Sequence, residues 1–338
     1  MEKYVKWKDV VTGINPFLPT RGRRDSDSGG NPMVQIADVA KKNVLGPMVS
    51  LCKLVVVAVV VAMGVVLFKL SVFLSLVPSL KRAWVNLVSF LFGRLSLALL
   101  GFYWINEELL WLKKGIREKR DLKKSTVDRI ESGDIIVANH SSYIDILYLF
   151  TFHAPVFTKF SPETGLFRVI PFGPAMMRTG EYPSLNDLNA KETLQQICQR
   201  AKDMQSGPVI VFPEATTTNG RALLQFAYDG LFDQVNPNQF KIHVMGFRYH
   251  FQDYSPSYVI CKYSPMNFEL GDSHDGPIEG QLSEAYKSLS ATILNILIAV
   301  TRLKVTGFSV RDKREFFDLF LSKENSETKG VTSKKKMQ

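Results

Sequence analysis

The sequence predicts an α/β fold, in which a mostly parallel sheet is flanked by helices and follows membrane-embedded helices near the amino terminus. Two patterns support this prediction. From Asp134 onward, short apolar runs alternate with longer helical stretches, which is typical of a parallel sheet with crossover helices. Before that point, no acidic residue occurs between Asp38 and Glu107, and the stretch contains long uncharged apolar runs. The chain therefore divides into an apolar amino-terminal part and an α/β domain.

Composition excludes several classes of protein. The chain has 338 residues, of which 46% are hydrophobic and 22% charged, so it is not a disordered protein. Its three cysteines, Cys52, Cys198 and Cys261, form no CxxC pair, which argues against a disulfide framework or a zinc ribbon and favours a reducing compartment. With 42 lysines and arginines against 32 acidic residues, the formal net charge is +10. Such a charge suits nucleic acid, a membrane surface or an anionic substrate.

The apolar part predicts membrane-embedded helices. Residues 1–43 are expected to form a basic cytosolic segment, and residues 44–105 a membrane-embedded helix or helical hairpin. A helix needs about 20 mostly apolar residues to span a bilayer. Val44 to Phe68 and Ala83 to Ile105 reach this length if the one basic residue inside each extends its charge to the membrane surface.

Basic residues flank this segment on both sides, so the positive-inside rule places both flanks in the cytosol. This arrangement favours an even number of crossings, or a helix pair that turns near Pro78 to Arg82 without crossing. The alternative is a pair of buried core helices, but the run VVVAVVVAMGVV has no polar side to turn toward water.

The α/β part contains a series of expected strands and helices. Strands are expected in GDIIVANHSS, PVFTKF, GPVIVFPEA, KIHVMGFRYH and YVICKY, because each is a short apolar run bounded by turn residues. Helices are expected over Leu185 to Met204 and over Gln281 to Arg302. Residues 106–310 would form this domain, and residues 311–338 a carboxyl-terminal helix and basic tail.

The sequence has no GxSxG, Walker A, GxGxxG or HExxH pattern, which excludes the commonest hydrolase, nucleotide-binding and zinc motifs. Two other motifs could carry chemistry. Asn139 to Asp145 reads NHSSYID, and Phe212 to Gly220 reads FPEATTTNG. Each begins where an expected strand ends, and the carboxyl ends of parallel strands share one edge of a sheet. The motifs are therefore expected to face one cleft. Asp145 would lie about one helical turn beyond His140 and accept a hydrogen bond from its ring, which would leave the other ring nitrogen free as a base.

Plain structural interpretations compete with these functional ones. Ser142 and Asp145 have the spacing of a helix capping box, with Asp in place of Glu. Glu214 could be an ordinary loop carboxylate, and Asn139-His140-Ser141 is formally a glycosylation sequon, which would go unused in a cytosolic domain.

Together, the motifs resemble those of the glycerolipid acyltransferase family typified by lysophosphatidic acid acyltransferases. The family's first motif, NHxSxxD, matches at Asn139, His140, Ser142 and Asp145. Its third motif, FPEGTxS-like, is matched with Ala215 in place of Gly and with Thr217 where many members have Arg. The run Thr216 to Arg221 looks more like the branch that acylates lysophosphatidylcholine and lysophosphatidylethanolamine.

Weaker matches extend the resemblance. Lys159, Pro171 and Gly173 look like the lysine and Pro-Gly region near the second motif, although Arg178 precedes Gly180 where the motif arginine should follow a glycine. The amino-terminal MEKYVKWKDVVTGINPFLP looks like fungal lysophosphatidic acid:oleoyl-CoA acyltransferases of the endoplasmic reticulum and lipid droplets.

The resemblance implies an acyl-CoA-dependent 1-acylglycerol-3-phosphate O-acyltransferase at the endoplasmic reticulum membrane or lipid droplets, with its catalytic domain facing the cytosol. His140 would be the general base, oriented by Asp145. The residues implied in substrate binding are Asn139, Ser142, Lys159, Arg178, Glu214, Thr216 and Thr217. Acyl-CoA is a co-substrate, and no metal or other cofactor is expected. The expected partners are the lysophospholipid, acyl-CoA and the membrane, and not nucleic acid.

Alternatives remain open at this point. The acceptor could be lysophosphatidylcholine or lysophosphatidylethanolamine, and the protein could be a catalytically weak lipid-binding scaffold or a thioesterase. Thr217 supplies a hydroxyl where a bidentate phosphate contact needs a guanidinium, so another cation, with Arg221 the nearest in sequence, would have to replace it. Ala215 would be strained if the backbone there needs the positive φ that Gly tolerates.

Overall fold

The computed structural model describes residues 4–20, 46–74, 77–113, 116–120, 129–228, 230–232, 235–236, 238–249, 255–257 and 284–321. The expected strand YVICKY, Cys261, most of the basic segment 1–43 and the basic tail lie outside these residues.

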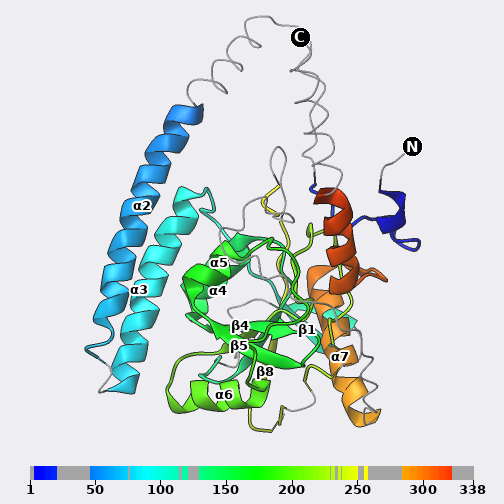
Figure 1. The fold of residues 1–338 in the computed structure, drawn as a ribbon. Helices are drawn as coiled ribbons and strands as arrows, with labels where there is room; N and C mark the ends of the chain where they lie inside the picture. Colours follow the sequence, from blue (N-terminus) through cyan, green and yellow to red (C-terminus); the bar gives the residue numbers. More distant parts are fainter. Residues whose placement is uncertain are drawn as a thin grey trace, which may run out of the picture.

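The central sheet has five strands in the order β5-β4-β6-β3-β8 (Figure 1). β3 (Ile135–Ala138) pairs in parallel with β6 (Val209–Val211) and β8 (Ile242–Met245). β4 (Val156–Ser161) also runs parallel to β6. The edge strand β5 (Leu166–Ile170) is antiparallel to β4. The sheet is therefore mixed but mostly parallel, as the alternating pattern predicts.

Central strands of this sheet are apolar on both faces because helices cover both. Ile135 and Val137 face one core, which α6 (Leu194–Asp203) covers. Ile136 faces the other core, which α4 (Tyr143–His153) covers. All residues of β3 and β6 are buried, which explains why these strands appear in the sequence as continuous apolar runs.

Four of the five expected strands lie in the described residues and are confirmed as β3, β4, β6 and β8. The expected helix over Leu185 to Met204 is too long, because α6 begins only at Leu194, where Thr193 and Gln196 form a capping box. β5 was not predicted. The expected helix over Gln281 to Arg302 corresponds to α7 (Glu284–Thr301). The remaining described elements are η1 (Val5–Trp7), β1 (Leu109–Lys113), β2 (Ile116–Arg120), α5 (Phe172–Met177), β7 (Ala222–Leu223), β9 (Lys304–Val305) and a helix over residues 310–321.

Two long helices, α2 (Gly46–Leu70) and α3 (Pro78–Leu99), lie side by side at one flank of the sheet (Figure 1). Within α2, Leu51–Leu70 is long and apolar enough to cross a membrane, by length and composition, and only 6% of it is buried. It is the single such segment in the described residues.

The second helix differs from the sequence expectation. α3 ends at Leu99 instead of Ile105, and its buried residues Ser89, Gly93 and Leu97, spaced four residues apart, lie on one side. This side packs against α4, with Gly93 so close to Thr151 that a Cβ there would lie 2.2 Å from the Thr151 Oγ1. α3 therefore joins α2 to the α/β domain, and only α2 meets the criteria for a membrane-spanning helix.

The two ends of the described chain pack together. Trp7 and Phe17 from the amino-terminal segment 4–20 share a buried cluster with Phe316 and Phe317 of the helix over residues 310–321. Trp7 meets Phe316 edge to face, with ring centroids 5.9 Å apart. This packing brings both ends beside the end of β7, since Leu224, which follows this strand, belongs to the same cluster.

Candidate active site

The two sequence motifs meet at the carboxyl edge of the sheet. His140 follows β3 and Phe212 follows β6, and these strands are neighbours. The His140 ring lies 4.3 Å from the Phe212 ring, centroid to centroid. The backbone N–H of Thr218 donates to the His140 carbonyl at 3.0 Å. The predicted convergence of the motifs is confirmed.

A cleft that is open to solvent begins at this junction. Five of the expected site residues line it: His140, Lys159, Arg178, Thr216 and Thr217. Asn139, Ser142, Asp145 and Glu214 do not line it; they lie buried behind it. The candidate site thus has a surface that can touch a ligand and a buried layer that supports it.

His140 has the properties of a neutral base. Its side chain is 9% exposed, and its Nε2 is buried without a hydrogen-bond partner in the part of the chain that the structure describes. Burial, helped by the positive charge of Lys313, lowers the pKa of His140 to about 3. The imidazole is therefore uncharged at neutral pH, with one nitrogen available to accept a proton.

Asp145 does not hold the His140 ring as the sequence predicted. Its Oδ2 accepts hydrogen bonds from the backbone N–H groups of Ser141 and Ser142, at 2.7 and 2.8 Å. Its Oδ1 accepts one from the Tyr249 hydroxyl. Among the residues that the structure describes, no hydrogen bond joins the His140 ring to Asp145, and the carboxylate instead binds the turn and Tyr249. The competing capping-box interpretation is confirmed at the start of α4.

Burial raises the pKa of Asp145 to about 6, although the hydrogen bonds from Tyr249, Ser141 and Ser142 act in the opposite direction. The carboxylate is thus the acceptor that fixes the turn immediately after His140.

Asn139 and Ser142 join the first motif to the segments beyond β8. The Asn139 amide accepts from the Phe247 N–H at 2.7 Å and donates to the Phe247 carbonyl at 3.1 Å. The Ser142 hydroxyl donates to the Pro256 carbonyl at 2.7 Å. Both side chains are fully buried, so they support the motif and do not reach the cleft.

Glu214 is buried in the third motif. Its Oε2 accepts from the Leu224 N–H at 2.9 Å, and its Oε1 has no partner in the described part of the chain. Burial raises the pKa of Glu214 to about 8. Ala215, which follows it, has φ of 52°, so this position does use the left-handed backbone that Gly adopts more readily.

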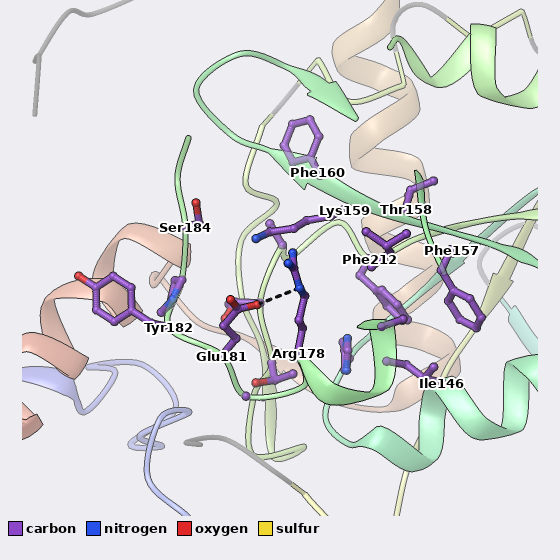
Figure 2. Close-up of a pocket in the computed structure, with 18 residues that line it drawn as sticks. Ile146, Phe157, Thr158, Lys159, Phe160, Arg178, Glu181, Tyr182, Ser184 and Phe212 are labelled. Atoms are coloured by element: carbon purple, nitrogen blue, oxygen red, sulfur yellow. Dashed lines mark ion pairs between the residues drawn. The ribbon is translucent and has the colours of Figure 1, made fainter. Parts of the chain in front are cut away.

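The polar end of the cleft carries charges of both signs. Figure 2 shows Lys159, Arg178 and Glu181 pointing toward one another. The Arg178 Nε lies 3.8 Å from the Glu181 carboxylate, and the Lys159 Nζ lies 3.9 Å from Asp187. Burial lowers the pKa of Lys159. Both cations are partly exposed in the cleft, where they can bind an anionic group.

Lys313 was missed by the sequence reasoning. Its Nζ donates to the carbonyl oxygen and to the hydroxyl of Thr217, at 2.5 and 2.9 Å. Arg221, the cation considered from the sequence, is exposed. In the sequence, Lys313 stands out only as a lysine on the apolar side of the helix over residues 310–321. It is 96 residues away from Thr217, and no local pattern connects the two.

Comparisons with known proteins agree with these motifs. The acyltransferase family profile matches residues 115–245. A Schizosaccharomyces pombe protein named as a lysophosphatidic acid:oleoyl-CoA acyltransferase is 28% identical over 232 residues, which cover 67% of each chain. The Arabidopsis thaliana lysophospholipid acyltransferase LPEAT1 is 31% identical over 148 residues, which cover 40% of this chain and 37% of that protein. No solved structure matches the chain. The motifs, the matched domain and these relatives all support the glycerolipid acyltransferase family as the one that this chain resembles.

Proposed function

We propose that this protein transfers an acyl group from acyl-CoA to the free hydroxyl of a lysophospholipid, with lysophosphatidic acid as the principal acceptor and phosphatidic acid as the product. The observation that carries this proposal is the unpartnered Nε2 of a neutral His140, in a cleft that also holds two cations, Lys159 and Arg178. The name of the fungal relative supports the choice of acceptor and acyl donor.

The reaction needs one proton acceptor. The His140 Nε2 takes the proton of the acceptor hydroxyl while the oxygen attacks the thioester carbonyl carbon. The carbon–sulfur bond breaks, the coenzyme A sulfur leaves as a thiolate, and it takes the proton back from His140. General-base assistance of this kind contributes about 10² to 10⁴-fold in rate. The proposed reaction uses acyl-CoA as a co-substrate and requires no metal ion or further cofactor.

The acceptor phosphate would bind at the polar end of the cleft. Lys159 and Arg178 offer charge-assisted hydrogen bonds, which are about twice as strong as neutral ones. Thr216 and Thr217 line the same cleft as these cations and His140. In this proposal, Asp145 contributes by fixing the turn that carries His140.

A second acceptor is supported by Glu181, which lines the cleft beside Arg178. A zwitterionic head group such as phosphoethanolamine carries an ammonium group that could pair with this carboxylate while its phosphate binds the cations. The name of the plant relative, and the likeness of residues 216–221 to the lysophosphatidylethanolamine branch, point in the same direction. Lysophosphatidylethanolamine is therefore the second candidate acceptor.

We place the protein at the endoplasmic reticulum membrane or on lipid droplets, with α2 embedded in lipid and the α/β domain on the cytosolic side. The apolar length of α2 and the lipid-soluble products of the proposed reaction support this location.

The test measures acyl transfer from labelled oleoyl-CoA to a panel of lysophospholipids, in membranes that contain the wild type, His140→Ala or His243→Ala. His243 is the matched control, because its ring pairs with Asp134 at 3.4 Å and does not line the cleft. Transfer to lysophosphatidic acid that is lost only in His140→Ala supports the proposal. A preference for lysophosphatidylethanolamine selects the second acceptor, and fatty acid release without an acceptor indicates a thioesterase. If the wild type transfers to no acceptor, the catalytic proposal is wrong and the scaffold interpretation replaces it.

A further inference from the structure

Lys313 is a fully buried lysine, and its surroundings are mostly apolar. It extends from the helix over residues 310–321, next to the aromatic cluster of Trp7, Phe17, Phe316 and Phe317. Its Nζ also lies 5.6 Å from the centre of the Phe317 ring. A buried ammonium group costs stability unless it is well paired, and a methionine of similar length would fill the same space without that cost. The position therefore calls for a reason other than packing.

The polar contacts of Lys313 lead directly to the candidate base. Both acceptors of its ammonium group belong to Thr217, whose side chain lines the cleft. The next residue, Thr218, donates its N–H to the His140 carbonyl. Two successive residues thus connect Lys313 to the backbone of His140. Lys313 itself does not line the cleft, so it acts through this loop and not on a substrate.

We propose that Lys313 is a positioning residue for His140, which fixes the loop of residues 212–220 through its two hydrogen bonds to Thr217. This inference rests on the proposed role of His140 as the base. A positive charge at this place also opposes protonation of the imidazole, although burial is the larger cause and lowers the pKa of Lys313 itself to about 7.

The amino-terminal segment supports the same loop from a neighbouring position. Asn219 donates its backbone N–H to the Pro16 carbonyl at 3.0 Å. Its side-chain amide donates to the carbonyls of Asn15 and Leu18, at 2.8 and 3.0 Å. Segment 4–20 and the helix over residues 310–321 pack on each other, so the two ends of the described chain together set the position of one active-site loop.

The experiment compares the full-length wild type with Lys313→Met, which removes the charge and the donors at similar length. Lys6→Met is the matched control. Lys6 belongs to segment 4–20, which packs on the helix that carries Lys313, but its side chain is exposed and pairs with the exposed Glu315. Two quantities are measured: kcat and KM for acyl transfer, and amide hydrogen exchange of the peptide that covers residues 212–224. We expect Lys313→Met to lose about tenfold to hundredfold in kcat, with little change in KM. We also expect its amide hydrogens to exchange faster than those of the wild type in this peptide, and at the wild-type rate elsewhere. Lys6→Met should match the wild type in both.

Wild-type kcat and loop exchange in Lys313→Met would overturn the proposal, and so would faster exchange spread evenly over the chain, which a purely structural role predicts. If Lys313→Met does not fold, Thr217→Val decides, since it removes one of the two acceptors. Faster exchange confined to the same peptide supports the proposal, and unchanged exchange contradicts it. A wild type without any transfer activity would overturn the proposed function alone, because the exchange measurement tests the position of the loop independently.

Discussion

Arg82 offers a direct test of how α3 is attached to the α/β domain. Its guanidinium donates to the carbonyls of His153 and Ala154, both at 2.7 Å, and to the exposed carbonyl of Ser206 at 3.1 Å. The first two carbonyls are partly buried and would lose a charged donor in Arg82→Met. Counting about 1.5 kcal/mol for each of these two bonds, and nothing for the exposed one, gives a destabilisation of about 3 kcal/mol.

The matched control is Lys81→Met, which removes the same charge from the adjacent exposed position. A surface change of this kind is expected to stay within about 0.5 kcal/mol. Thermal unfolding of the purified proteins in detergent micelles measures both, and about 3 kcal/mol corresponds to a fall of about 4 to 6 °C in Tm. Equal Tm values for the two variants would refute the reasoning, because Arg82 would then not attach α3 to the domain.

Three further predictions concern the buried part of the site. Because the pKa of His140 falls from 6.5 to about 3 on folding, the unfolded chain binds the extra proton below pH 6.5, and the folded protein loses stability as the pH falls from there toward 3. Between pH 7 and pH 5, the free energy of unfolding of His140→Gln, measured with denaturant, should therefore fall by about 2 kcal/mol less than that of the wild type. An identical pH dependence of the two proteins would contradict this. Ala215→Gly should raise the free energy of unfolding by at most about 1 kcal/mol, since relief of the positive φ outweighs the added freedom of the unfolded chain. A clear loss in Tm would argue against backbone strain at this position. Asn139→Ala should cost about 2 kcal/mol by leaving both Phe247 backbone groups unpaired, with the acceptor KM unchanged, whereas a raised KM would mean that Asn139 touches the substrate.

The sequence patterns were sufficient to predict those elements whose burial follows from their own residues. The runs that became β3 and β6 are apolar on both faces, and such runs occur almost only in the centre of a covered sheet. β5 was missed because its run LFRVI contains Arg168 and is only partly buried, as suits an edge strand. The start of α6 was missed because the helical pattern gave no weight to the Thr193 cap.

The part of the candidate site that was predictable is the part whose position follows from the order of the strands. Parallel pairing of β3 and β6 is enough to bring the two motifs together. The predicted bond between His140 and Asp145 failed because sequence spacing cannot rank competing donors. In the capped turn, the backbone N–H groups of Ser141 and Ser142 donate to the carboxylate instead. Lys313 could not be foreseen, since its contact with Thr217 depends on how the chain ends pack.

Four buried ionisable side chains bear on the choice between an enzyme and a lipid-binding scaffold. His140 lines the cleft, Asp145, Glu214 and Lys313 lie buried behind it, and burial is the largest cause of the pKa shift in each. A scaffold could place apolar side chains at these positions and gain stability, because desolvating charges is costly even when they are paired. Perturbed groups of this kind are concentrated at functional sites, where the protonation state of a base has to be controlled. The arrangement therefore favours a site that moves a proton, and the loop attached to Lys313 is the part of it on which that control depends.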